Sequence, residues 1–196
     1  MEIMGYKNID CLYDRSREGR FNTLSRGNSK LDGFALAVMQ YMAARSSDWE
    51  PDRTYHAGDV PPRCYWGGWD AIIDDFGMVM PTEEQALDDT VDKEELFARR
   101  HKSSLARLST TGRWLERHGL IKKIVPANTK LGRNAFWLLM IGDDFENEQV
   151  EQAARAPHWG WTCSADTDPL AMFERELWIR SNMRKMLRLN MRIRHF

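Results

Sequence analysis

Cysteine is scarce in this chain, and its three cysteines stand far apart. Cys11, Cys64 and Cys163 form neither a CxxC pair of the kind that binds zinc nor an even-numbered disulfide framework. The sequence therefore predicts reduced thiols. The five histidines are equally dispersed, and no two have the i, i+4 spacing that places both imidazoles on one face of a helix. We expect no bound metal.

The chain also lacks long apolar runs and the short motifs of common enzymes. No stretch of about 18 apolar residues occurs, and residues 1–7 lack the apolar core of a signal peptide. We therefore expect a cytoplasmic protein with no membrane partner. No nucleophile motif, Walker loop or dinucleotide fingerprint is present, and Gly67-Gly68 is too short to cradle a phosphate. The sequence predicts neither catalysis nor a cofactor.

Paired acids are the one feature of the sequence that would suit catalysis. The carboxylates of Asp74, Asp75, Asp88 and Asp89 are ligands of the type that Mg²⁺ prefers, as a nuclease would require. Paired acids within a highly charged segment are, however, usually solvated surface residues.

The composition is ordinary, but the charge is distributed unevenly. A length of 196 residues suits one domain with appendages, and 42% hydrophobic and 29% charged residues are typical of soluble globular proteins. The formal net charge is −1. Ten acids and one lysine lie between Asp70 and Glu95, whereas ten bases and one acid lie between Arg99 and Arg133. Because the Debye length at physiological salt is about 8 Å, a phosphate backbone would respond to the nearer block rather than to the sum.

The first part of the chain predicts an arm followed by a helix. Residues 1–29 have short apolar clusters separated by arginines, with no sustained period, so we expect a loosely ordered basic arm. Ser29 and Asp32 are residue types that cap helix N-termini. The apolar residues that follow recur on one face of a helix; they are Phe34, Ala35, Val38, Tyr41 and Met42.

A loop, a short helix and an acidic segment are predicted next. Residues 46–64 are rich in proline, glycine and charge, which is typical of a loop. Residues 68–76 have apolar side chains at helical spacing, and Gly77 is suited to end that helix in the left-handed conformation. The acidic segment 78–92 has few large apolar residues and predicts a solvated insertion that contains at most a helical turn.

A third helix is predicted over residues 93–118, with its end at Gly119. Ser103 and Ser104 are able to cap a second start inside this stretch, so one long helix and two consecutive helices both remain open. Gly112 costs about 1 kcal/mol relative to alanine in a helix interior, and it indicates close packing, a bend or a break.

The remaining sequence predicts a hairpin and an extension. Residues 120–125 and 135–141 are apolar, strand-forming runs joined by a turn at 128–134. The extension, 142–196, ends in a predicted helix from about residue 169. It has an apolar face and a stripe of arginines at four-residue spacing, namely Arg180, Arg184, Arg188 and Arg192. This helix suits dimerisation, further phosphate contacts or docking on its own domain.

A short segment carries a resemblance to a known family. Leu115, the polar residues 116–118, and Gly119, Leu120 and Ile121 match the end of the third helix in winged helix-turn-helix proteins, and the resemblance covers roughly residues 24–141. It implies a mainly α fold with a small β-hairpin, in which residues 30–141 form a three-helix core plus wing. Residues 65–77 resemble the second helix of this family, and residues 24–42 are similar to the entry segment and first helix of phage and plasmid replication initiators. The chain is also similar to transcription regulators. The long acidic insertion and Gly112 depart from the family pattern.

The resemblance implies binding of double-stranded DNA, because the major groove admits one helix whose polar side chains meet base edges. We expect Arg107 and Arg113 to contact bases, while lysines along the wing contact the backbone. The full set of predicted DNA-binding residues is Arg99, Arg100, Lys102, Ser103, Arg107, Thr110, Arg113, Arg117, Lys122, Lys123, Lys130 and Arg133.

Two alternatives to DNA binding remain. The basic residues are also consistent with the solvated face of an amphipathic helix. Winged helices serve as protein-binding modules as well, and the acidic insertion would then be a docking surface, or a shield that covers the basic helix until DNA competes. Possible partners are therefore double-stranded DNA, a second copy of the chain or another protein.

Overall fold

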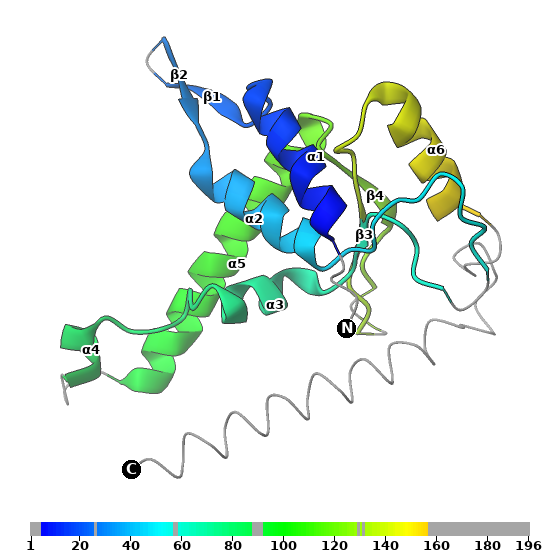
Figure 1. Ribbon diagram of the computed structural model, residues 1–196. Coiled ribbons are helices and arrows are strands. Elements are labelled where there is room, and N and C mark those ends of the chain that lie inside the picture. Colours follow the sequence, from blue (N-terminus) through cyan, green and yellow to red (C-terminus); the bar gives the residue numbers. More distant parts are fainter. Residues whose placement is uncertain are drawn as a thin grey trace. The chain divides into compact units, whose positions relative to one another are not determined.

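The computed structural model describes residues 5–25, 27–56, 59–87, 92–128, 130 and 132–156. The chain divides into two units, Met1–Ala156 and Pro157–Phe196, and the description concerns the first. This unit is a mixed α/β domain with small antiparallel sheets (Figure 1). Its elements are α1 (Tyr6–Arg17), β1 (Asn22–Ser25), β2 (Asn28–Leu31), α2 (Gly33–Ala44), β3 (Cys64–Tyr65), α3 (Gly68–Asp75), α4 (Glu83–Leu87), α5 (Lys93–Arg117), β4 (Ile121–Val125), β5 (Phe136–Leu139) and α6 (Asp144–Ala154).

The N-terminal segment is ordered structure that belongs to the core. The helix α1 packs on α2, and Leu12 from α1 and Phe21 beyond it are fully buried in the main hydrophobic cluster. The expectation of a loosely ordered arm is therefore wrong for the described residues of 1–29. Helix and hairpin form there because tertiary burial of Leu12 and Phe21 outweighs the weak local pattern.

The strands β1 and β2 form an antiparallel hairpin that projects from the body of the domain, at the top of Figure 1. Asn22 pairs with Leu31 and Ser25 pairs with Asn28, and Gly27 in the turn has a φ of +80°. The positive φ is a conformation that glycine adopts without steric cost. Leu24 is 85% exposed on this hairpin.

The predicted first and second helices are confirmed as α2 and α3. The side chain of Asp32 caps α2 by accepting hydrogen bonds from the backbone N–H groups of Phe34 and Ala35. The helix α3 ends just before Gly77, which has a φ of +62°. Neither helix nor extended strand occurs between Ala44 and Cys64 in the described residues, as expected of a loop.

The helix α5 is continuous over 25 residues, which decides between the two open alternatives. Asp92 caps it by accepting from the N–H groups of Glu94 and Glu95, and Gly119 follows its end with a φ of +67°. Ser104 therefore does not cap a second helix start; it is buried in the middle of α5. The short helix α4 is the helical turn of the acidic insertion.

The predicted hairpin is confirmed as β4 and β5, with a third strand beside it. The strand order is β3-β5-β4, and Cys64 pairs with Leu138 while Ile121 pairs with Leu139. The strand β3 escaped prediction because two residues carry no readable period. Its pairing with a strand more than 70 residues away holds it in place.

Both faces of this sheet are covered. Trp137 and Leu139 of β5 join the main core with α5, whereas Leu138 packs with Val150 of α6 on the other side (Figure 1). Cys64 lies in this second cluster, where burial raises the pKa of its thiol to about 12, so it stays protonated at neutral pH.

Because α6 belongs to the first unit, the predicted boundary of the extension at residue 142 falls inside that unit.

The predicted basic helix from residue 169 lies outside the described residues, as does Cys163. Within the described part of the chain, no helix is both long enough and apolar enough to span a bilayer.

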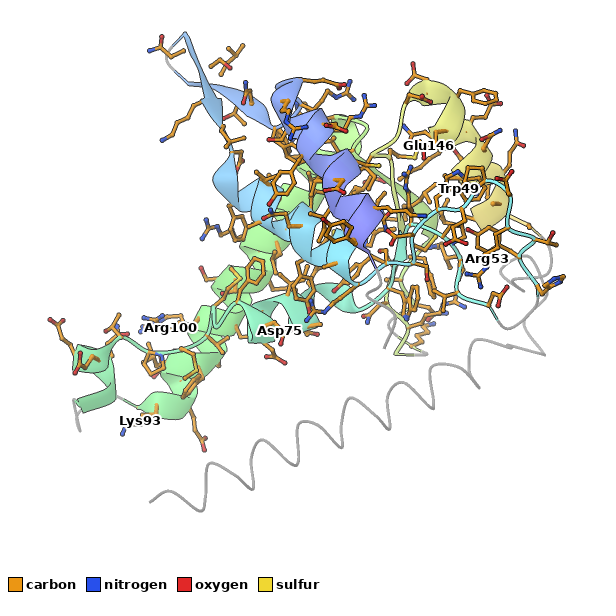
Figure 2. The ribbon with its side chains drawn as sticks, in the orientation of Figure 1. Trp49, Arg53, Asp75, Lys93, Arg100 and Glu146 are labelled. Carbon is orange, nitrogen blue, oxygen red and sulfur yellow. The ribbon has the colours of Figure 1, made fainter. Side chains whose placement is uncertain are left out.

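A buried arginine joins the two terminal helices to the sheet. Arg63, just before β3, is 2% exposed and has a φ of +52°. Its Nε donates to Oδ1 of Asn8 in α1 at 3.1 Å, and its Nη2 contacts Oε1 of Glu146 in α6 at 3.0 Å. Figure 2 labels Glu146 on α6. The guanidinium therefore holds three distant segments together.

Candidate nucleic-acid interface

The exposed face of α5 gathers half of the predicted DNA-binding residues. Ser104, Leu108, Gly112 and Leu115 are buried at intervals of four, four and three residues, and they define the inner face of the helix. The opposite face carries exposed polar side chains from Arg99 to Arg117, a span of about 27 Å at 1.5 Å per residue. These side chains are Arg99, Lys102, Ser103, Thr110, Arg113 and Arg117.

Four cations on this exposed face have no carboxylate partner. Among the described residues, no ion pair involves Arg99, Lys102, Arg113 or Arg117. Two of them instead contact neutral atoms of their own helix. The Nη2 of Arg113 donates to Oγ1 of Thr110 at 3.3 Å, and the Nε of Arg117 donates to the carbonyl of Arg113 at 3.3 Å. Their charge is therefore directed to solvent.

Arg100 lies on a flank of α5, and its guanidinium donates hydrogen bonds to the acidic insertion. Its Nη1 donates to the carbonyl of Met80 at 2.8 Å, and its Nη2 donates to Oε1 of Gln85 at 2.6 Å (Figure 2). Ser104 donates to the carbonyl of Met78 at 3.4 Å on the same side. The acceptors in these contacts are neutral. The described carboxylates of the insertion form no ion pair with the four cations on the exposed face.

Arg107 faces α2 rather than the exposed face. Its guanidinium carbon lies 3.6 Å from the centre of the Phe34 ring, a cation–π contact. Position 107 is about 120° around the helix from Arg113, since each residue advances the helix by about 100°. The two residues predicted to contact bases therefore lie on different sides of α5.

The two lysines of β4 point to opposite sides of the sheet. Lys123 lies on the α5 side, 3.8 Å from Oε2 of Glu116 and 4.7 Å from the centre of the Trp137 ring. Lys122 lies on the α6 side, where its Nζ donates to Glu151 at 2.7 Å. The expectation that all wing cations share one surface with the third helix is therefore wrong for Lys122, because neighbouring residues of a strand alternate in direction.

The remaining predicted cations, Lys130 and Arg133, belong to the turn of the hairpin. Asn128 and Arg133 form an isolated antiparallel bridge, and the N–H of Lys130 donates to Oδ1 of Asn128 at 3.1 Å. Lys130 is exposed, whereas Arg133 is half-buried. The structure thus places Lys130 at the end of the hairpin.

A hollow of about 300 Å³ lies between α3, α5 and the β4–β5 hairpin. The indoles of Trp69 and Trp137 form its aromatic part, with ring centroids 5.8 Å apart. Its polar lining comes from Ser109, Arg113, Glu116 and Lys123. Sequence reasoning missed the hollow, because only tertiary packing brings these elements together.

The described acids that were considered for a metal site, Asp74 and Asp75, belong to no cluster of potential metal ligands. Asp75 accepts hydrogen bonds from Arg45 at 2.6 Å and from the hydroxyl of Tyr41 at 2.9 Å. The described part of the chain contains no group of three or more potential metal ligands. Asp88 and Asp89 lie outside the described residues.

Comparisons with known proteins found no match to a family model, to a curated protein or to a solved structure. The interpretation of the interface therefore depends on the residues and the geometry described above.

Proposed function

We propose that the protein binds double-stranded DNA by placing the exposed face of α5 in the major groove. The groove is about 12 Å wide and admits one α-helix. Arg113 then reaches base edges, while Arg99, Lys102 and Arg117 neutralise phosphates on either side of the groove. Ser103 and Thr110 add hydroxyl groups to the same surface.

The single observation that carries this proposal is the set of four unpaired cations on one helix face. A merely solvated face normally mixes both signs of charge. Glu116 is the only acid between Arg99 and Arg133, and it lies on the flank beside Lys123. The local field at this surface is therefore positive, although the whole chain has a net charge of −1.

The arrangement of elements supports a winged helix-turn-helix interpretation. The helices α2, α3 and α5 contribute to one core, and the β4–β5 hairpin follows α5 directly. Lys123 and Lys130 give this hairpin positive charge beside the helix, as a wing against the DNA backbone requires. The acidic insertion enlarges the connection between α3 and α5 and leaves their packing intact.

The resemblance implies a role in transcription regulation or in replication initiation of the phage or plasmid type. Both roles require recognition of a defined duplex sequence. Footprinting on the DNA that flanks the reading frame separates them, since protection of a promoter indicates regulation and protection of repeated origin sequences indicates initiation.

The test is the affinity for random duplex DNA at several salt concentrations. We expect a steep fall of affinity with salt, and a log–log slope that becomes shallower by about one for each of Arg99→Ala and Arg117→Ala, the proposed phosphate contacts. Lys122→Ala is the matched control, because this cation is held by Glu151 on the other side of the sheet. Negligible affinity at any salt would reject the proposal in favour of a protein-binding module.

A further inference from the structure

The hollow beside α5 combines features that contact with an intact duplex does not require. The half-buried indole of Trp69 provides an aromatic surface next to Trp137, which is 8% exposed; two cations stand at the rim, and Glu116 and Ser109 provide hydrogen-bonding atoms. Phosphate contacts need the cations alone, and base-edge contacts in a groove need no aromatic surface. The aromatic part therefore indicates a planar ligand.

We propose that this hollow receives one unstacked nucleotide of the bound DNA, with its base against Trp69 and Trp137 and its phosphate at Arg113 and Lys123. The inference rests on the proposed function, and it adds a preference for DNA in which one nucleotide is unpaired. It assigns a role to Trp69, Ser109 and Glu116, which the groove-binding surface does not use.

The size and lining of the hollow suit a single base. A volume of about 300 Å³ lies at the lower end of the range for small-molecule pockets. Bases of any identity stack on aromatic side chains, because every base has a π-face. The carboxylate of Glu116 is able to accept a hydrogen bond from an amino group on the edge of a base. A base therefore meets both an aromatic surface and an acceptor.

The cations at the rim are available for the phosphate that accompanies the base. Lys123 lies 3.8 Å from Glu116 and 4.7 Å above the Trp137 ring, and its side chain is exposed. A long, flexible lysine in such an exposed pair is held weakly, so it can move from the ring to a phosphate. Arg113 donates to the neutral hydroxyl of Thr110, so a phosphate would give it a charged partner.

Gly112 has no side chain, and this leaves room for the indole of Trp69 at the floor of the hollow. A Cβ at this position would lie 2.7 Å from Cζ2 of Trp69. The indole of Trp69 therefore lies directly against the backbone of α5, beside the positions that line the hollow. The ligand site and the DNA-facing side of the helix share Arg113, so one bound molecule is able to engage both.

An unpaired nucleotide is the form of DNA that reaches this site most easily. Taking a paired base out of a duplex costs unstacking and unpairing, and that cost is least where the base is already unpaired. The experiment therefore compares a fully paired duplex with the same duplex carrying one bulged nucleotide. We expect about tenfold tighter binding of the bulged duplex, a ratio that lies within the range of base–aromatic stacking.

Ser109→Phe is the decisive variant, because it fills the hollow and leaves every cation in place. We expect it to remove the tenfold preference while the fully paired duplex binds with unchanged salt dependence. Glu116→Leu keeps the approximate size of the side chain and removes its acceptor, and we expect the preference to fall severalfold. Lys122→Ala, on the opposite side of the sheet, should leave the preference intact. Circular dichroism and thermal unfolding verify that each variant is folded.

The outcomes separate this inference from the proposed function. Tight, salt-dependent binding of the paired duplex with no gain from the bulge overturns the nucleotide site and leaves groove binding in place. A preference that survives Ser109→Phe and Glu116→Leu also overturns it. A deoxynucleoside monophosphate that shifts the indole N–H NMR signals of Trp69 and Trp137, in a protein that does not bind duplex DNA, supports the site and rejects groove binding.

Discussion

The backbone of Gly112 in α5 lies directly against the indole of Trp69 in α3. A Cβ at Gly112 would come within 2.7 Å of Cζ2 of Trp69 and within 3.0 Å of its Cη2. Of the three interpretations that the sequence allowed for this glycine, close packing is therefore correct, since α5 passes through it without a break. Glycine suits this position of α5 because the indole of Trp69 from α3 occupies the space that a side chain would fill.

Gly112→Ala should consequently destabilise the protein, against the trend of helix propensity. Alanine gains about 1 kcal/mol in a helix interior, whereas forcing an extra carbon into a packed contact costs about 1–3 kcal/mol. We expect a net loss of about 1 kcal/mol in the free energy of unfolding, measured with urea. Ser103→Ala, on the exposed face of the same helix, should stabilise slightly. Stabilisation by Gly112→Ala would show that Trp69 moves aside freely.

Arg63→Ala should be among the most damaging substitutions in the described domain. It removes a guanidinium that is 2% exposed and leaves the partners Asn8 and Glu146 without their hydrogen-bond donor. Arg63 is buried while Glu146 is 31% exposed, so we expect a loss of about 2–3 kcal/mol from the unsatisfied partners. Denaturant unfolding measures the loss. Arg53→Ala, which breaks an exposed pair with Asp59, is the control and should change stability by less than about 1 kcal/mol. Similar losses for both variants would refute the structural role of Arg63.

The contribution of Glu151 should depend on pH in a defined direction. Burial raises the pKa of this carboxyl, but hydrogen bonds from Lys122 and Arg155 outweigh it and bring the pKa below its ordinary value of 4.5. A lowered carboxyl pKa stabilises the folded state above the ordinary value, and that stabilisation is lost as the pH falls through the folded pKa. Lys122→Met should therefore cost about 0.5 kcal/mol at pH 7 and much less well below pH 4.5. A cost that is the same at both pH values would contradict the pairing.

Arg107 should matter more for folding than for DNA binding. Its guanidinium stacks on Phe34 at 3.6 Å, and an exposed cation–π contact contributes about 0.5–1 kcal/mol. We expect Arg107→Ala to lower the free energy of unfolding by that amount, while the salt slope for duplex DNA changes less than in Arg117→Ala. The reverse ranking of the two variants on DNA would return Arg107 to the base-contacting surface.

Local signals predicted those elements that carry strong periodicity and end markers. The helices α2, α3 and α5 have apolar residues at helical spacing, and Asp32, Gly77 and Gly119 mark their limits. The helix α1 gave no such signal, because only Asn8 and Leu12 are buried among its 12 residues. Its stability comes from packing against α2, which no short window of sequence reveals.

The site was predictable only as far as helix geometry determines it. Positions of α5 opposite the buried Leu108 and Leu115 are exposed, so four cations could be found by counting residues. These are Arg99, Lys102, Arg113 and Arg117. The direction of Arg107 depends on Phe34 of another helix, and that of Lys122 depends on Glu151 of α6. The hollow required Trp69 and Trp137 to meet, and these residues are 68 positions apart.

The contacts of Arg63 also set the limits of the smallest piece of this protein that can fold alone. A fragment trimmed to residues 30–141, as the helix-and-hairpin pattern suggests, would omit both Asn8 and Glu146 and leave the guanidinium of Arg63 without these two partners. Leu12 and Phe21 would leave voids in the same fragment. The flanking helices α1 and α6 therefore close the domain from both ends, and an autonomous piece has to run from the beginning of one to the end of the other.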